Sequence, residues 1–252
     1  DMVLAPQSYS NPNNTSGRPE FAVSSLTYTY VDINFYYAST AQGSIDLTGS
    51  RVFSGAEWIK NDGYYTLRLY LQKAGGFYGY SAEYNDSGQL VFSFLHPAKV
   101  NTAGGAGSLN GVTVVIDAGH GGTDPGAAGS IAGMHEAQLN LIMAQKIESK
   151  LKALGANVVM TRTGDTYLSL VGRNVVTRNT DPDIFVSIHR NSATSSTAKG
   201  YENFYFYPFS MPLAQSIFDS VASTGHLTMR SVKFYPYYVT RVTECPSILT
   251  EN

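Results

Sequence analysis

The chain has 252 residues, of which 43% are hydrophobic, and its formal net charge at pH 7 is −2. These values predict one large or two modest globular domains with a substantial apolar core. The small net charge gives no electrostatic reason to expect a nucleic acid or an anionic membrane as partner, and no apolar run approaches the roughly 18 residues of a membrane span. Cys245 is the single cysteine, which excludes an intrachain disulfide and a zinc cluster of several thiolates, and we expect it to be buried.

The N-terminal part of the chain has the sequence pattern of an all-β domain. Residues 1–20 are rich in Asn, Pro and Ser and predict a flexible lead-in, whose start at Asp1 without a signal-peptide core indicates a processed or trimmed product. Over residues 21–100, alternating, tyrosine-rich runs separated by glycine-containing turns predict a small β-sandwich. The alternation changes phase at residue 31, which indicates a bulge or bend between two extended runs. Tyrosines on such a domain serve either core packing or contact with a glycan or a partner protein.

Residues 101–111 are small and glycine-rich and predict a linker to a second domain over residues 112–252. That domain alternates strand and helix patterns, which favours an α/β fold with a mostly parallel sheet covered by helices on both faces. The strands are predicted over 112–117, 157–162, 183–189, 202–207 and 246–251, and the helices over 136–154, 168–179 and 211–223. In the first helix, the apolar residues at helical spacing include Leu139, Ile142, Met143, Ile147 and Leu151.

Two histidines follow apolar, β-branched runs that are typical of buried parallel strands. His120 comes after Asp117-Ala118-Gly119, and His189 ends the run that starts at Ile184. Because chemistry in open α/β sheets gathers at the carboxyl ends of the strands, the two imidazoles are candidates for half of a zinc site.

Carboxylates at the same expected edge of the sheet could complete this site. Glu136 starts the helix that follows the glycine-rich loop after His120, and it is the candidate third ligand, although an ordinary acidic residue at a helix start would look the same. Asp117 is a candidate partner that orients His120, or alternatively a cap of the loop. Glu251 ends the last predicted strand, and in a parallel sheet its carboxylate would reach the same edge.

Residues 112–251 resemble the zinc-dependent N-acetylmuramoyl-L-alanine amidases of the Amidase_3 type. The resemblance rests on several motifs in order, which are Val115-Ile116-Asp117-Ala118-Gly119-His120-Gly121-Gly122, Asp124-Pro125-Gly126-Ala127, Glu136-Ala137-Gln138-Leu139-Asn140-Leu141, Thr161-Arg162, Arg173, Asp183-Ile184-Phe185-Val186-Ser187-Ile188-His189 and Pro246-Ser247-Ile248-Leu249-Thr250-Glu251.

The resemblance implies Zn²⁺ as cofactor, with His120, Glu136 and His189 as its ligands and Glu251 as the catalytic carboxylate. It also implies that Arg241 touches the substrate. The expected reaction is hydrolysis, by zinc-activated water, of the amide between N-acetylmuramic acid and the L-alanine of the peptidoglycan stem peptide. The expected location is the bacterial cell envelope or the extracellular space. Two alternatives are a zinc carboxypeptidase-like amidohydrolase and an inactive wall-binding module.

Three positions depart from the family pattern. Arg190 follows His189 where a small residue or Asn is usual, so it either places a cation beside the metal, where it could bind substrate, or points outward. His135 adjoins Glu136 and is expected to be a bystander, because neighbouring helical residues point about 100° apart. The chain stops at Asn252, where the family continues with a further helix, so the catalytic domain is expected to be truncated.

Overall fold

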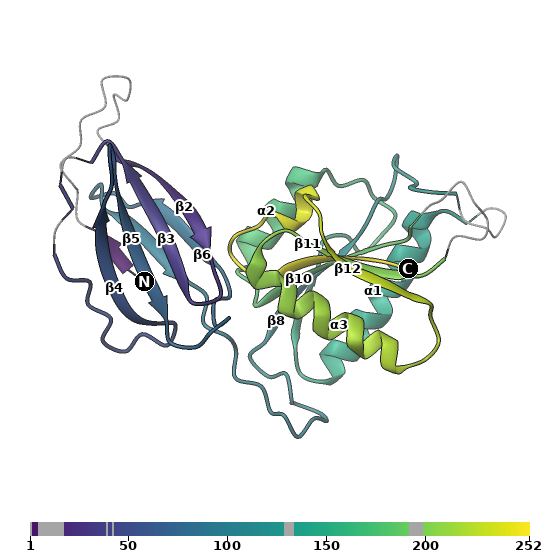
Figure 1. The fold of residues 1–252 in the computed structure, drawn as a ribbon. Helices are drawn as coiled ribbons and strands as arrows, with labels where there is room; N and C mark the ends of the chain where they lie inside the picture. Colours follow the sequence, from purple (N-terminus) through teal and green to yellow (C-terminus); the bar gives the residue numbers. More distant parts are fainter. Residues whose placement is uncertain (1, 5–17, 39, 42, 129–133, 192–198) are drawn as a thin grey trace. The chain divides into compact units, whose positions relative to one another are not determined.

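The computed structural model describes residues 2–4, 18–38, 40–41, 43–128, 134–191 and 199–252. It divides the chain into two compact units, Asp1–His96 and Pro97–Asn252 (Figure 1). Most of the predicted lead-in, residues 1–20, lies outside the described residues. Among the described residues, no helix combines the length and the apolar character needed to cross a membrane.

The first unit consists of two antiparallel sheets. One sheet has the order β2-β3-β5-β4 and the other has the order β1-β7-β6. Their strands are β1 (Met2–Leu4), β2 (Glu20–Leu26), β3 (Tyr30–Tyr36), β4 (Phe53–Lys60), β5 (Tyr64–Leu71), β6 (Tyr80–Tyr84) and β7 (Leu90–Phe94). Aromatic side chains join the two sheets, since the rings of Phe21 and Phe92 are 5.3 Å apart and those of Phe53 and Phe94 are 4.7 Å apart. These contacts form the apolar centre of a β-sandwich.

The predicted bulge or bend at residue 31 is a hairpin turn in the structure. Residues 27–29 connect β2 to β3, and the side-chain oxygen of Thr27 accepts hydrogen bonds from the backbone N–H groups of Thr29 and Tyr30. The phase of the alternation changes because the chain reverses direction here, so that the run over 26–30 is not one strand.

The second unit is an α/β domain, as predicted, with a six-stranded sheet of order β12-β11-β13-β10-β8-β9. All neighbouring strands are parallel except the pair β11 and β13. Helices α1 and α3 lie on opposite faces of the sheet (Figure 1). The elements are β8 (Thr113–Ala118), α1 (Glu136–Ala153), β9 (Asn157–Met160), α2 (Leu170–Thr180), β10 (Ile184–His189), β11 (Tyr201–Tyr205), α3 (Met211–Ser223), β12 (Met229–Phe234) and β13 (Ser247–Glu251), with short 3₁₀ turns at Pro208–Ser210 and Tyr238–Thr240.

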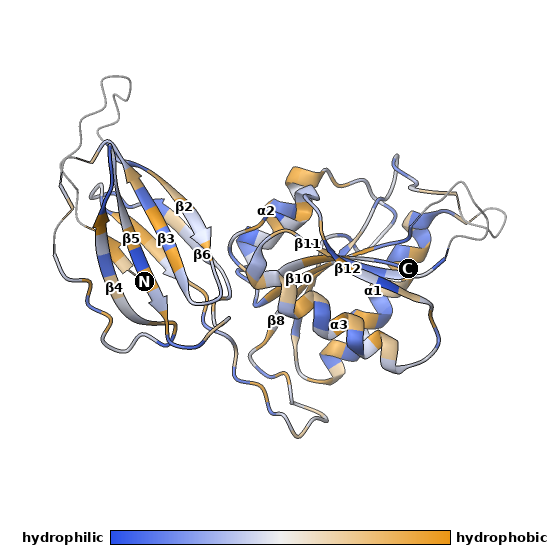
Figure 2. Cartoon of the chain, viewed as in Figure 1, coloured by the Kyte–Doolittle hydropathy of each residue, from blue (hydrophilic) through white to orange (hydrophobic). Residues whose placement is uncertain are grey.

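The core of this unit lies between the central strands and α1, and Figure 2 shows the apolar character of these strands. On α1 the buried positions are Ala137, Asn140 and Ala144, with Glu136 at the helix start, whereas Ile142, one of the apolar residues at helical spacing, is 45% exposed. Small side chains let the helix approach the sheet closely. Cys245 is buried as predicted, and burial raises the pKa of its thiol to about 12.

The segment over 101–111, predicted as a linker, belongs to the second unit in the structure. The backbone N–H of Leu109 donates to the carbonyl of Leu154, and the side chain of Leu109 packs against the core of this unit. The structure places the division of the chain earlier, between His96 and Pro97.

Candidate metal centre

The carboxyl ends of three neighbouring strands bring the predicted site residues to one edge of the sheet. In the register of the parallel strands, Ile188 of β10 lies opposite Ala118 of β8, and His189 lies opposite Glu251 of β13. His120 follows β8 by two residues, and Glu136 is the first residue of α1. The three strands therefore place the imidazoles of His120 and His189 and the carboxylate of Glu251 at the same edge of the sheet.

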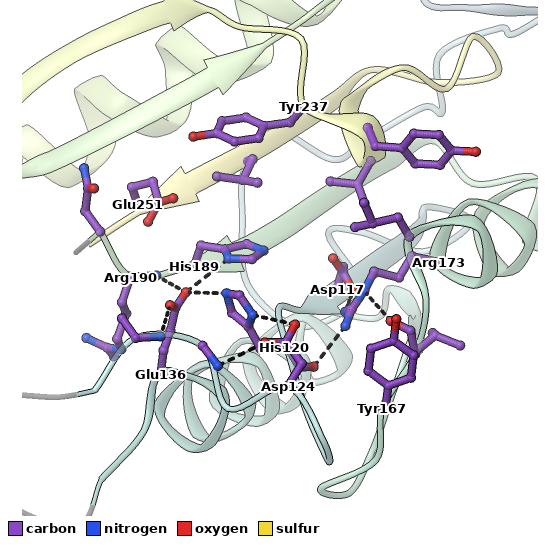
Figure 3. Close-up of a pocket in the computed structure, with 18 residues that line it drawn as sticks. Asp117, His120, Asp124, Glu136, Tyr167, Arg173, His189, Arg190, Tyr237 and Glu251 are labelled. Carbon is purple, nitrogen blue, oxygen red and sulfur yellow. Dashed lines mark hydrogen bonds and ion pairs between the residues drawn. The ribbon is translucent and has the colours of Figure 1, made fainter. Parts of the chain in front are cut away.

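His120, Glu136 and His189 form a compact group in which one potential ligand atom from each residue lies within 4.8 Å of the other two (Figure 3). The Oε1 atom of Glu136 is 3.3 Å from His120 Nε2 and 3.1 Å from His189 Nδ1. Ligand atoms about 2.1 Å from one tetrahedral ion lie roughly 3.4 Å apart, so these separations fit a common metal ion. Two nitrogens and one carboxylate oxygen are also a donor set that zinc accepts.

Glu136 is held rigidly, as a metal ligand requires. Its Oε2 accepts a hydrogen bond of 3.0 Å from the backbone N–H of Ala127, and its Oε1 accepts one of 2.9 Å from the backbone N–H of Arg190. The side-chain amide of Asn140 donates to the same Oε1 at 3.2 Å. Burial alone would raise the pKa of Glu136, but the hydrogen bonds from His120, His189 and the backbone outweigh it and hold the pKa well below its usual range.

The ring of His120 is oriented by Asp124, whereas the sequence offered Asp117 either for this role or as a cap of the loop. Asp124 Oδ2 lies 2.8 Å from His120 Nδ1, which leaves Nε2 to face Glu136. The hydrogen bond with Glu136 raises the pKa of His120 to about 9, although burial opposes the shift and Asp124 adds to it. A carboxylate on the far nitrogen fixes the position of a ligating imidazole and makes it more basic.

Asp117 instead stabilises the fold, because donors from other elements bind both of its carboxylate oxygens. It is fully buried and accepts hydrogen bonds of 2.6 Å from the hydroxyls of Thr161 and Ser187 and an ion pair from Arg173. These donors come from the end of β9, from β10 and from α2. Asp117 therefore ties three elements together beneath the metal-ligand group.

Two buried arginines hold the chain where it leaves β8. Arg162 donates to the carbonyls of Ala118 and Gly119, and Arg173 donates to those of Ala118 and His120. His120 itself has φ = 61°, a left-handed conformation that residues other than glycine rarely adopt. The arginines stabilise this conformation by satisfying the carbonyls around it.

Two glycines allow the backbone to approach the ligands. A Cβ on Gly119 would lie 2.3 Å from His189 Nε2, and one on Gly126, whose φ is 66°, would lie 2.7 Å from the ring of His120 and 2.9 Å from Glu136. Any side chain at either position would displace a ligand.

Glu251 stands beside the ligands without a partner for one of its oxygens. Its Oε2 is buried and makes no hydrogen bond among the described residues. Burial raises the pKa of Glu251 to about 7; the charge of His189 lowers it, while Glu136 and Glu202 raise it further. A carboxylate with such a pKa can exchange a proton near neutral pH.

The group opens into a cavity of about 570 Å³. Its lining includes Tyr167, Leu170, Tyr237 and Tyr238, which no pattern in the sequence had assigned to the site. They come from the loop before α2, from α2 itself and from the region before β13, and only the fold brings these segments together.

The remaining predicted residues differ in their placement. Arg190 lines the cavity, whereas Arg241 is not among its described lining residues. The guanidinium of Arg241 donates to the carbonyl of Pro236 at 3.0 Å and lies 5.6 Å from the ring centre of Phe206, so it is occupied outside the cavity. His135 is exposed at the N-terminus of α1 and is not part of the metal-ligand group.

Comparisons with known proteins agree on the second unit. The family model described as N-acetylmuramoyl-L-alanine amidase matches residues 114–252. The uncharacterized protein YqiI of Bacillus subtilis is 38% identical over 147 residues, which are 57% of this chain and 70% of that protein. The N-acetylmuramoyl-L-alanine amidase LytC of Bacillus subtilis is 37% identical over 146 residues, which are 56% of this chain and only 29% of LytC.

Among solved structures, the catalytic domain of CwlV, an N-acetylmuramoyl-L-alanine amidase from Bacillus (Paenibacillus) polymyxa, is 40% identical with a TM-score of 0.53. The match covers 56% of this chain and 79% of that one. An N-acetylmuramoyl-L-alanine amidase from Clostridium difficile 630 is 36% identical with a TM-score of 0.54 and the same coverage. The family model spans more than half of the chain, and the matched range includes the three residues of the metal-ligand group. This chain belongs to the N-acetylmuramoyl-L-alanine amidase family of the Amidase_3 type.

Proposed function

We propose that this chain hydrolyses the amide between the lactyl group of N-acetylmuramic acid and the L-alanine of the peptidoglycan stem peptide, with a zinc ion held by His120, Glu136 and His189. The observation that carries the proposal is the position of Glu136 Oε1, 3.3 Å and 3.1 Å from the two imidazole nitrogens. Membership of the amidase family supports the choice of substrate.

The residues of the chain divide the work of the reaction. When bound, zinc polarises the scissile carbonyl and lowers the pKa of a coordinated water towards about 7. His120, Glu136 and His189 would hold the ion, and Asp124 keeps the ring of His120 in its binding orientation. In an open coordination site of this type, the protein supplies three ligands and leaves a position for water or substrate.

Glu251 is the proposed general base. It lies opposite His189 in the sheet and lines the same cavity as the three ligands. Its unpartnered Oε2 and its pKa of about 7 suit a group that takes a proton from the attacking water and passes it to the leaving amine.

The proposed substrate implies action in the cell envelope or outside the cell. The first unit would then carry a contact to the wall glycan or to a partner protein, or act as a spacer. Tyr28 and Tyr37 of this unit are 66% and 50% exposed, which supports a contact role.

The test is to measure zinc content and cleavage of purified muropeptides on one preparation, with mass spectrometry of the products. We expect one zinc per chain and free peptides that begin with L-alanine. Glu251→Gln should keep the zinc and lower turnover by about 10²- to 10⁴-fold. His189→Ala should lose the zinc, and the exposed His226→Ala is the matched control.

Three results would contradict the proposal. Release of a single C-terminal amino acid instead of the whole stem peptide would identify a carboxypeptidase-like enzyme. Stoichiometric zinc in His189→Ala would remove that residue from the ligand set, and undiminished turnover of Glu251→Gln would remove Glu251 from the mechanism.

A further inference from the structure

The two arginines that line the metal cavity differ in what they bind. Arg173 is buried, and its guanidinium is occupied by Asp117 and by backbone carbonyls. Arg190 forms no ion pair within the described part of the chain, and its buried Nε has no hydrogen-bond partner there. Arg190 is therefore a cation beside the metal-ligand group with donors to spare.

The backbone fixes where this cation starts. Arg190 follows His189, the last residue of β10, and its own N–H donates to Glu136 Oε1 at 2.9 Å. Its side chain therefore starts next to two metal ligands, since His189 precedes it in the sequence and Glu136 binds its backbone N–H. An arginine side chain reaches only about as far as two extended residues, so any group that it binds must lie close to the scissile bond.

The opposite side of the cavity has a different character. Figure 3 shows Tyr167 and Arg190 on opposite sides of the two histidines. Tyr167, Leu170 and Tyr238 line the cavity, and these side chains are 57%, 54% and 42% exposed. Leu170 begins α2 three residues after Tyr167, and the backbone carbonyl of Tyr238 accepts a hydrogen bond from Asn174 of α2, so the side of Tyr167 offers aromatic and apolar surface. The side of Arg190 offers a guanidinium.

The proposed substrate has a matching asymmetry about its scissile amide. The sugar on the acyl side has apolar ring faces that can pack on aromatic side chains, whereas the peptide on the amine side carries carboxylates. The first free carboxylate along the stem is the α-carboxylate of the second residue, where that residue is not amidated. Guanidinium binds carboxylate through paired, charge-assisted hydrogen bonds.

We propose that Arg190 binds the α-carboxylate of the second stem-peptide residue, while the sugar lies towards Tyr167 and Tyr238. Arg190 then determines specificity, because it favours stem peptides with a free carboxylate over peptides with a carboxamide at that position. This inference rests on the proposed function, since it orients the substrate of that same site.

The experiment compares two muramoyl tripeptides that differ only in a free α-carboxylate or a carboxamide on the second residue. The zinc-loaded full chain should prefer the carboxylate in kcat/KM by about tenfold to a hundredfold. In Arg190→Gln the ratio of the two kcat/KM values should be close to one. The change should come mainly from a higher KM for the carboxylate peptide, because the contact forms on binding. Arg190→Lys should retain part of the preference. Arg178→Gln, an exposed arginine paired with Glu244, should retain all of it.

A wild-type protein without preference, or a preference that survives in Arg190→Gln, would overturn the proposal. Calorimetric binding of the two peptides to Glu251→Gln, with and without Arg190→Gln, separates this inference from the proposed function. If the wild type cleaves neither peptide but Arg190→Gln abolishes selective binding of the carboxylate, the function fails and the role of Arg190 stands. Equal binding of both peptides to Glu251→Gln rejects the role of Arg190 whatever the turnover.

Discussion

Two clusters of charged side chains lie at the same edge of the six-stranded sheet, and they differ in how completely their polar atoms are paired. Around Asp117, the hydroxyls of Thr161 and Ser187 and the guanidinium of Arg173 occupy the carboxylate. Around His189, the neighbouring Glu251 keeps a buried oxygen unpartnered among the described residues, next to a cavity. A buried polar cluster that is fully bonded rigidifies a fold, whereas an incomplete one marks a place where a ligand supplies the missing bonds.

The two clusters are joined by the backbone at the end of β8. Arg173 binds Asp117 in the first cluster and also the carbonyl of His120 in the second. The paired cluster therefore sets the geometry of the incomplete one. Changes in the first should appear as lost stability, and changes in the second as lost metal affinity or altered proton binding.

The largest expected effect is in the paired cluster. Arg173→Ala leaves a buried Asp117 carboxylate without its counter-charge, so the free energy of unfolding of the metal-free protein should fall by about 3–5 kcal/mol. Urea unfolding measures the change. Arg178→Ala, whose side chain is 53% exposed and pairs with Glu244, should cost no more than about 1 kcal/mol. Equal losses of unfolding free energy in the two variants would show that the buried pair of Arg173 and Asp117 stabilises the fold no more than an exposed ion pair does.

An intermediate effect is expected from the pH dependence of stability in the incomplete cluster. The pKa of Glu251 is about 7 in the folded protein and near the ordinary value of 4.5 in the unfolded chain. Between these values the folded state keeps a proton that the unfolded state releases, so raising the pH lowers the free energy of unfolding. The total contribution is at most about 3 kcal/mol.

Glu251→Gln removes this contribution and provides the comparison. Urea unfolding of both metal-free proteins from pH 4 to pH 8 should show the wild type losing stability relative to the variant as the pH rises. Parallel curves for the two proteins would mean that Glu251 titrates normally, and that its site is not a low-dielectric environment.

The smallest expected effect concerns the partner of His120. Asp124→Asn keeps a hydrogen-bond acceptor near Nδ1 but removes the negative charge, so zinc affinity should fall about 10- to 100-fold. Competition with a chelating dye measures the affinity. Asp165→Asn, an exposed residue that binds the backbone of Gly122 in the same region, is the control and should change affinity little. Unaltered affinity in Asp124→Asn would assign the orientation of His120 to its backbone alone.

Much of the second unit could be predicted from sequence because the residues within each strand or helix identify that element without reference to distant segments. The apolar runs before His120 and His189 are strands β8 and β10, and the helix predicted from residue 136 begins at Glu136. The first unit was harder to predict. The alternation changes phase near the turn at residues 27–29, but threonine rather than glycine makes this turn, so the sequence predicted a bulge or bend instead of a hairpin.

The side chains that can do chemistry were identified from local sequence, because a histidine or glutamate at the end of an apolar strand is recognised from its neighbouring residues. Their partners depend on how the domain packs. Asp124 rather than Asp117 orients His120, and Arg241 turns to Pro236 while Arg190 lines the cavity. The physical reason is that each of these side chains has several possible partners within reach. The partner that each side chain binds depends on which distant segments pack against it and satisfy its hydrogen bonds. For Asp117 these segments are α2, β10 and the end of β9.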